Sequence, residues 1–231
     1  MKRLLRWLGS LLLLALLAVM AYQTWILAHV WYWVDHNPAS SAFMDARARE
    51  LKSQAPPRYI EHQWVDYKDI SRELKRALIA SEDAKFLDHD GFDWEGIERA
   101  YNRNLERGRI VAGGSTITQQ LAKNLFLTRD RTPWRKAQEA LITLMIERLM
   151  SKRRILELYM NLIEWGDGVF GAQAAAIHYF GINASQLNAT QAAKLAAMVP
   201  NPRFYDKNRS ARGLQKKTKV IGARMRSAVV P

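Results

Sequence analysis

Two neighbouring carboxylates, Glu82 and Asp83, are the residues of this 231-residue sequence best suited to acid–base chemistry. They come where a predicted helix ends, and the helix dipole disfavours carboxylates there, so helix electrostatics does not explain them. A carboxylate pair beside a loop can serve as general base or general acid, because each charge disfavours ionisation of its neighbour. A structural role stays open, in which Asp83 pairs with Lys85 or His89.

The segment "GGSTITQQLAKN", residues 113–124, has the composition of an anion-binding site. It predicts a helix that begins at Ser115 or Thr116, because Thr116 and Gln119 have the spacing of a capping box. The free amide hydrogens at such a helix start, with Lys123 further along, suit phosphate oxygens. A well-capped surface helix explains the segment equally well.

Two later segments carry charges at helical spacing. "RKAQE" places Arg135 and Glu139 four residues apart with Lys136 beside the arginine, which an ordinary surface ion pair worth about 0.2–0.5 kcal/mol also explains. "KRRILELYMN", residues 152–161, fits an amphipathic helix. Neither segment alone distinguishes a functional from a structural role.

The composition limits the classes of partner and site. The chain is 48% hydrophobic, which suffices for a sizeable core, and it has no cysteine, so disulfides and thiolate chemistry are excluded. A formal net charge of +13 favours an anionic partner, whether nucleic acid, an anionic membrane or a phosphorylated substrate. No nucleic-acid-binding motif is present, so we expect no nucleic-acid partner.

The N-terminus predicts a membrane anchor. From Trp7 to Val34 the chain has no Lys, Arg, Asp or Glu, and this stretch is longer than the roughly 20 residues that a spanning helix needs. Lys2, Arg3 and Arg6 precede it, so the positive-inside rule keeps the N-terminus in the cytoplasm and exports the remainder. The competing interpretation is a signal peptide cleaved after Ala21, but the apolar stretch continues well past that site.

The remaining chain is predicted to be a short stem followed by a mostly helical domain. Tyr59 to Tyr67 is the one plausible strand, and helices follow it. The proposed divisions are residues 1–6 as a cytoplasmic N-terminus, 7–34 as the transmembrane anchor, 35–58 as a stem and 59–231 as the domain with a basic C-terminal tail.

Cap and breaker residues predict where these helices begin and end. Asp69 or Ser71 caps the helix that leads to Glu82, and Asp93 caps a second helix that ends at Gly108. A long helical stretch runs from Trp134 to about Ile163, with an interruption near Ser151. Two alanine-rich helices then stop at Gly181 and Pro200. In the basic tail, Leu214, Ile221 and Met225 have helical spacing, which predicts an amphipathic helix packed on the domain; its solvent face could also approach anionic lipid.

Taken in order, "EDAKFLDHDG", "GGSTITQQLAKN", "RKAQE", "KRRILELYMN" and "GDGVFGAQAAAIHYFG" resemble the successive motifs of the peptidoglycan glycosyltransferase family, the lysozyme-like enzymes that polymerise lipid II. The resemblance covers residues from Ile70 to Tyr205, and five motifs in one order are a specific signal. It implies a mainly α, lysozyme-like domain with a large lobe and a small membrane-associated lobe, preceded by one transmembrane helix.

The resemblance also implies site residues. The catalytic base falls on Glu82 and a second essential carboxylate on Glu139. The groups implied to bind the substrate are Asp83, Phe86, His89, Ser115, Thr116, Gln120, Lys123, Asn124, Arg135 and Lys136. The fourth motif, more structural in character, is matched by Lys152, Glu157, Tyr159 and Asn161. Trp165-Gly166 replaces the Arg-Gly of many members, which puts in doubt any contact assigned to that arginine.

The implied activity is polymerisation of lipid II into linear β-1,4 glycan strands by inverting transfer, with release of polyprenyl diphosphate. We expect no transpeptidase activity, because the sequence contains neither a Ser-x-x-Lys nor a Lys-Thr-Gly motif. The expected cofactor is a divalent cation, Mg²⁺ or Mn²⁺, at the diphosphate, with its ligands unassigned, and no organic cofactor. Expected partners are lipid II, the growing lipid-linked strand, membrane lipids and other cell-wall synthases or division proteins. The expected location is the bacterial inner membrane, in a single pass, with the catalytic domain in the periplasm.

Two other functions stay open. A lysozyme-type hydrolase would need a glutamic acid with a raised pKa and no phosphate site, whereas Lys123, Arg135 and Lys136 are expected to hold a nearby glutamate ionised. A non-catalytic membrane-anchored scaffold could bind anionic cell-wall polymer through the basic tail, but it leaves the carboxylate pair unexplained.

Overall fold

The computed structural model describes residues 2–109, 113–130 and 132–231, so Met1 of the predicted cytoplasmic segment lies outside the described residues. The chain divides into two compact units, one ending at Pro38 and one running from Ala39 to Pro231.

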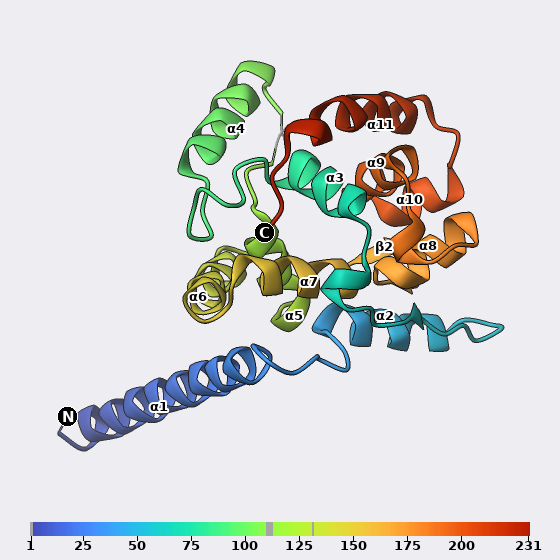
Figure 1. Cartoon of the computed structure of the whole chain (residues 1–231). Helices are drawn as coiled ribbons and strands as arrows, with labels where there is room; N and C mark the ends of the chain where they lie inside the picture. Colours follow the sequence, from blue (N-terminus) through green and yellow to red (C-terminus); the bar gives the residue numbers. More distant parts are fainter. Residues whose placement is uncertain (1, 110–112, 131) are drawn as a thin grey trace. The chain divides into compact units, whose positions relative to one another are not determined.

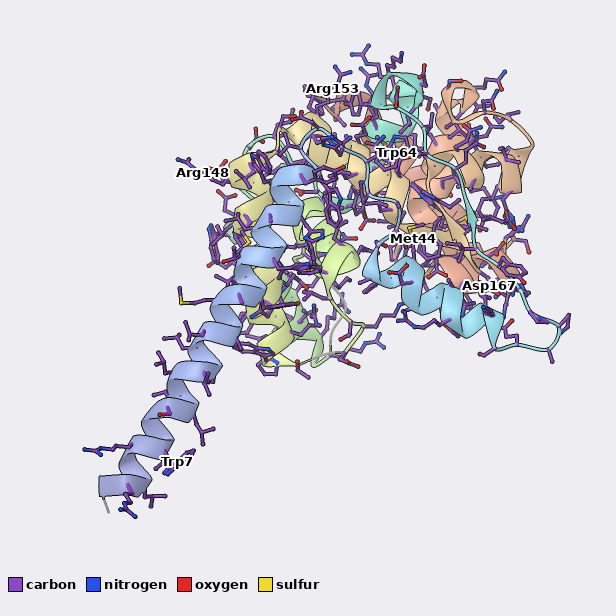
Figure 2. The ribbon with its side chains drawn as sticks, turned by 90° about the horizontal axis from the view of Figure 1, so that it is seen from below. Trp7, Met44, Trp64, Arg148, Arg153 and Asp167 are labelled. Carbon is purple, nitrogen blue, oxygen red and sulfur yellow. The ribbon has the colours of Figure 1, made fainter. Side chains whose placement is uncertain are left out.

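The first unit contains helix α1, Lys2–Tyr32. Its stretch Arg6–Tyr32 spans 27 residues and is long and apolar enough to cross a membrane. At about 1.5 Å per residue it would be roughly 40 Å long, which exceeds the ~30 Å hydrocarbon core of a bilayer. Many of its large apolar side chains are exposed, including Trp7, which Figure 2 labels near the start of the helix. A lipid environment would remove this apolar surface from water.

The second unit is built mainly of helices (Figure 1), as the sequence predicts. Its α-helices are α2 (Ala42–Lys52), α3 (Arg72–Glu82), α4 (Trp94–Arg107), α5 (Ile117–Phe126), α6 (Pro133–Leu149), α7 (Lys152–Leu162), α8 (Ala172–Phe180), α9 (Ala189–Met198), α10 (Pro202–Lys207) and α11 (Arg212–Arg224). Short 3₁₀ helices are η1 (Tyr67–Asp69), η2 (Ala184–Gln186) and η3 (Met225–Ser227).

The helix ends follow the predicted caps. Ser71 accepts a hydrogen bond from Leu74 N at the start of α3, and Thr116 with Gln119 forms the capping box of α5. Gly108 and Gly181 end α4 and α8 in the left-handed conformation, with φ of 60° and 66°. The interruption near Ser151 is confirmed, because Ser151 caps α7 directly after α6 ends.

The prediction of a single strand was wrong. Only Glu61–His62 of the predicted strand forms β1, and β2 (Glu164–Gly166) and β3 (Val169–Phe170) complete a small sheet in the order β1-β3-β2. β1 runs parallel to β3, and β2 is antiparallel to it. Strands of two or three residues carry too few alternating side chains to give a pattern that the sequence reveals.

The stretch assigned to the stem contains structure. α2 lies within it, and Met44 and Leu51 are buried there. In Figure 2, Met44 and Asp167 lie on the side of α2 that faces the rest of the unit, and the buried Arg47 of α2 bonds to Asp167. The predicted boundary at residue 59 stays a prediction, while the compact second unit begins at Ala39.

The helices of the second unit form two packed groups (Figure 1). α3, α9 and α11 pack on one another, and α5, α6 and α7 form the other group. The basic tail packs as its spacing predicts, because Leu214 and Ile221 of α11 and Met225 at the start of η3 are all buried. α4 differs from the other long helices of this unit, since none of its residues is buried.

Buried Asn161, near the end of α7, ties the core to the chain that follows β1. Its Nδ2 donates to Val65 O at 2.9 Å, and its Oδ1 accepts from Val65 N at 3.0 Å. The same Nδ2 also donates to Glu157 O at 3.0 Å. These bonds satisfy both backbone groups of Val65 in a partly buried loop, which matches the structural character expected of the fourth motif.

We predict that Asn161→Ala lowers the free energy of unfolding by about 2–4 kcal/mol, because the side-chain bonds are lost and two backbone groups are left without partners. Chemical denaturation of the full chain in detergent measures this change. Asn102→Ala, at an exposed position of α4, is the control and should have almost no effect. Equal stability of the two variants would contradict the assignment.

Candidate functional site

Glu82 lies where the two helix groups meet. It is the last residue of α3, and its Oε2 accepts a hydrogen bond from Gln120 Nε2 of α5 at 3.0 Å. Gln120 Oε1 in turn accepts from the hydroxyl of Tyr159, on α7, at 2.8 Å. The Tyr159 side chain is fully buried, which raises its pKa well above the ordinary value and keeps the hydroxyl protonated as a donor. The chain of bonds therefore fixes the amide of Gln120 with its N–H groups toward Glu82.

The carboxyl of Glu82 is only partly shielded from solvent, yet its surroundings favour the neutral form. Burial raises its pKa, while the Gln120 hydrogen bond and the positive charge of Lys217 act in the opposite direction. A glutamate with a raised pKa is better matched to proton transfer near neutral pH than an ordinary one. Proton transfer is therefore the chemistry that this environment suits.

Asp83 has a different environment from Glu82. Its Oδ2 accepts from Ile117 N, the first amide of α5, at 3.0 Å, and its Oδ1 bonds to His89 Nε2 at 2.9 Å. Gly91 N donates to the other ring nitrogen of His89, so His89 carries its proton on Nε2 in this arrangement. Both oxygens of Asp83 are therefore engaged within the protein, and the pairing with His89 that the sequence left open is present.

Phe86 and His89 lie in the loop after α3, where both contact Lys152 of α7. Phe86 is buried with the ammonium of Lys152 4.8 Å from its ring centre. Lys152 also donates to His89 O at 2.5 Å and pairs with Glu147 at 2.8 Å. These contacts join the loop after α3 to α6 and α7, so the two residues support the site through packing.

The glycine-led segment borders a polar hollow of about 340 Å³ beside Glu82. Ser115 is exposed there, whereas Thr116 is buried and donates to Gly91 O at 2.7 Å. The hollow is lined by Ala80, Ser81, Glu82, Asp83, Ala84, Asp93, Gly96, Arg99, Gly113, Gly114, Ser115, Thr116 and Arg224.

A second hollow, which we name the basic cleft, has a volume of about 430 Å³. It is lined by Phe43, Gln120, Lys123, Asn124, Arg129, Arg135, Ile163, Glu164, Val199, Pro200, Asn201, Pro202 and Arg203. Four of these residues are cations and one is a carboxylate, so the cleft is strongly positive. Gln120 lies in its wall and bonds to Glu82, which connects the carboxylate to the basic cleft.

Glu164 organises one side of the basic cleft. This buried carboxylate pairs with Arg129 at 2.8 Å and with Arg203 at 3.0 Å, and Arg47 of α2 approaches it at 3.5 Å. One carboxylate thus contacts three guanidinium groups, of which Arg47 and Arg203 also pair with Glu50, and Arg47 with Asp167. A buried carboxylate with several charge-assisted bonds fixes the direction of its partners.

Lys123 has no carboxylate within 4.0 Å among the described residues, and its ammonium lies 5.8 Å from the ring centre of Phe43. Burial lowers the pKa of Lys123; the negative charge of Glu139 opposes this shift, and the positive charges of Arg135 and Lys136 add to it. Asn124, also in the wall, donates to Gln120 O at 2.8 Å. An unpaired ammonium in a positive, partly desolvated cleft is strongly suited to an anion.

Glu139 is buried and lies behind the basic cleft rather than in its wall. Its Oε2 accepts from Arg135 Nη1 at 2.5 Å, and its Oε1 pairs with Lys136. Arg135 is the member of this trio that reaches the cleft wall, and its buried Nε has no hydrogen-bond partner among the described residues. Glu139 is therefore placed to fix Arg135, the cation of this trio that lines the cleft.

A third hollow, which we name the α11 groove, lies on another side of Glu82 and has a volume of about 520 Å³. It is lined by Ala80, Ser81, Glu82, Ala196, Ala197, Pro200, Gly213, Lys216, Lys217, Val220, Ile221 and Arg224. Its walls come from α3, α9 and α11. Glu82 therefore borders both the polar hollow and the α11 groove.

Several residues that line the basic cleft were not predicted from the sequence. Phe43, Arg129, Glu164 and Arg203 lie outside the quoted motifs or, for Glu164, beside the Trp-Gly departure, and only folding brings them to Lys123. Trp165 itself is fully buried, and its Nε1 donates to Met160 O at 3.3 Å. It serves the core rather than the basic cleft.

The described residues do not fit a metal held by the protein. They contain no group of three or more His, Asp or Glu side chains placed to bind one ion. Glu164, the one carboxylate in the wall of the basic cleft, is already occupied by arginines. The divalent cation therefore stays a prediction, and no step below passes through it.

The transglycosylase family model matches residues 48–226. Proteins described as biosynthetic peptidoglycan transglycosylase are similar along nearly the whole chain. That of Methylobacillus flagellatus is 63% identical over 220 residues, which cover 95% of this chain and 96% of the relative. That of Laribacter hongkongensis is 59% identical over 231 residues and covers all of both chains, and that of Chromobacterium violaceum is 58% identical over 214 residues.

The matched region includes Glu82, Gln120 and every cation of the basic cleft. The helical domain and the single apolar N-terminal helix agree with the mainly α, lysozyme-like architecture that the sequence predicts. The chain therefore belongs to the transglycosylase family and is a glycosyltransferase of peptidoglycan synthesis.

Proposed function

We propose that this protein polymerises lipid II into linear β-1,4 glycan strands, with release of polyprenyl diphosphate. The observation that carries the proposal is the link between Glu82 and the basic cleft through Gln120. A glycosyl transfer from a lipid diphosphate needs a base for the attacking hydroxyl and cations for the leaving group. The site has both within one connected set of residues.

In the proposed step, Glu82 takes the proton of the acceptor GlcNAc 4-hydroxyl while that oxygen attacks the anomeric carbon of the donor. The bond between this carbon and the diphosphate oxygen breaks, and the electron pair leaves with the diphosphate. Lys123 and Arg135 stabilise the negative charge that grows on the leaving group. Attack from the opposite face converts an α-linked donor into a β-linked product.

Hydrolysis is a second candidate, and one observation favours it. The raised pKa of Glu82 is also the property of a lysozyme-type general acid. The expectation that the cations hold the nearby glutamate ionised was wrong for Glu82. Arg135 and Lys136 pair with Glu139 instead. The basic cleft still favours transfer, since hydrolysis of a glycan has no diphosphate leaving group to bind.

The proposal includes an orientation and a product type. α1 would anchor the protein in the inner membrane, where both lipid-linked substrates are dissolved, with the second unit in the periplasm. The three basic residues before the apolar stretch support this orientation. The glycan strands would be left uncrosslinked, since the sequence has no transpeptidase motif.

Incubation of the purified protein with lipid II, followed by separation of the products by length, tests the function. New polymer supports transfer. Shortening of added glycan strands without polymer would mean hydrolysis, and binding without turnover would mean a scaffold. Either of the last two results would overturn the proposal.

We predict that Glu82→Gln lowers the polymerisation rate at least about 10²-fold, because the amide keeps the hydrogen bonding but cannot accept a proton. Lipid II binding and the melting temperature should be nearly unchanged. In the wild type, kcat/KM should rise with pH through the raised pKa of Glu82, since the base must be deprotonated. If the Gln variant still makes substantial polymer, Asp83 is the next carboxylate to test.

We predict that Lys123→Met lowers kcat about 10²-fold or more, with the loss persisting at saturating substrate, because the ammonium acts on charge that develops in the transition state. Lys75→Met is the control, since Lys75 is a buried lysine that likewise has no ion pair in the described residues but lines none of the three hollows. The lowered pKa of Lys123 predicts an alkaline loss of wild-type activity, and Lys123→Arg should remove this limb. Normal turnover in the Met variant would make Lys123 a surface residue.

We predict that Glu139→Gln lowers kcat by at least about 10-fold through loss of the fixed position of Arg135. Glu147→Gln is the matched control, because Glu147 lies on the same helix, is similarly buried and pairs with Lys152 outside the cleft. Turnover and melting temperature should be measured for both variants. If both lose activity only in proportion to stability, Glu139 has a structural role alone.

A further inference from the structure

The α11 groove is lined by one continuous face of α11. The residues of α11 in its wall are Gly213, Lys216, Lys217, Val220, Ile221 and Arg224, which recur at steps of three and four. This spacing places them on a single side of the helix. The opposite walls are the small side chains Ala80 of α3 and Ala196 and Ala197 of α9, and Glu82 stands at the end of α3.

The three cations of this face form no ion pair within the part of the chain that the structure describes. Lys216, Lys217 and Arg224 are exposed, and none has a carboxylate within 4.0 Å among the described residues. Lys217 lies with its ammonium 5.5 Å from the ring centre of Tyr205. Glu82 is the one acidic residue in the wall of the groove. Unpaired cations beside an apolar wall are complementary to a ligand with an anionic head and an apolar chain.

The proposed reaction uses two ligands of this kind. Transfer joins two lipid-linked sugars, and the diphosphate of the donor has to lie next to the bond that breaks, where the basic cleft supplies its cations. The acceptor instead presents a hydroxyl to Glu82, with its own diphosphate at the far end of a disaccharide. A second group of cations, separate from the basic cleft but reaching Glu82, would therefore suit the acceptor.

We propose that the α11 groove is the acceptor site, in which Lys216, Lys217 and Arg224 bind the diphosphate of the incoming lipid-linked sugar and the apolar wall contacts its polyprenyl chain. The inference rests on the proposed function, because it assigns the second substrate of that reaction. It gives the basic C-terminal helix a direct role in the reaction, whereas none of its residues lies in the motifs that resemble the family.

A kinetic experiment with separate donor and acceptor tests the proposal. The donor is a lipid-linked tetrasaccharide whose terminal 4-hydroxyl is capped, so it can only donate, and labelled lipid II is varied as acceptor. The triple variant Lys216→Ala, Lys217→Ala, Arg224→Ala should raise KM for lipid II at least about tenfold, with KM for the donor unchanged. The matched control removes three exposed cations outside the groove, in the triple variant Arg212→Ala, Lys219→Ala, Arg226→Ala.

The outcomes separate the alternatives. If both triple variants raise KM equally, the cations act only through general attraction to the membrane or substrate, and the proposal is overturned. A rise in KM for the donor alone would assign the groove to the other substrate, and an unchanged KM would leave the cations as solvated surface residues. Melting temperatures should stay within a few degrees of the wild type, because all the replaced side chains are exposed.

A binding experiment separates failure of this inference from failure of the proposed function. Farnesyl diphosphate is titrated calorimetrically into the full chain in detergent, and the wild type should bind at two sites. The groove variant should retain one site, and Lys123→Met should weaken the other. If the wild type made no polymer, the proposed function would fail. The number of binding sites would still show whether the α11 groove binds a lipid diphosphate. Two intact sites in the groove variant would overturn the inference in either case.

Discussion

The hydrogen bond from Ile117 N to the carboxylate of Asp83 is the interaction on which the arrangement of the site depends. It joins the residue after α3 to the first turn of α5, where a carboxylate is favoured by the free amides and by the helix dipole. One residue away from this bond, Glu82 meets Gln120, which lies one turn into α5. A shift of either helix would therefore break the contact that connects the base to the basic cleft. This explains why two adjacent carboxylates have separate tasks: Asp83 fixes the helices, and Glu82 remains available for proton transfer.

The cations of the basic cleft also fall into two kinds, those paired with a carboxylate and the unpaired Lys123. Glu164 and Glu139 each hold cations of the basic cleft by direct pairing, and both carboxylates are buried, so the directions of these cations are fixed. Lys123 is left unpaired in the described structure between these two groups, and its lowered pKa shows the cost of a positive charge in that position. Binding of an anion would relieve this cost without any rearrangement of the paired residues. A cleft that is arranged before the substrate binds is the condition under which charge stabilisation is most effective in catalysis.

The features predicted from the sequence were those with a local cause. Ser71, Asp93 and the pair Thr116 and Gln119 cap helices through bonds that span three residues, so their spacing suffices to place the helix starts. The sheet was missed because strands of two or three residues leave no periodic pattern. Arg129 and Arg203 were missed because their function depends on Glu164, which lies 35 and 39 positions away along the chain. The resemblance to a known family named most of the candidate site, but it did not show that Asp83, Thr116 and His89 are engaged in internal bonds, which only the folded arrangement reveals.

The segment that the sequence assigns to a stem supplies α2, which helps to build the basic cleft. α2 contributes Phe43 to its wall, and the ring centre lies 4.9 Å from the Arg129 guanidinium and 5.8 Å from the Lys123 ammonium. An aromatic face attracts cations without neutralising them, so it can hold these groups in place while the cleft keeps its positive charge. Arg47, one turn further along α2, is buried against Glu164 and Asp167, and it therefore supports the carboxylate that orients Arg129 and Arg203. Arg47 thus completes a buried ion network from within a stretch whose polar composition suggests a linker.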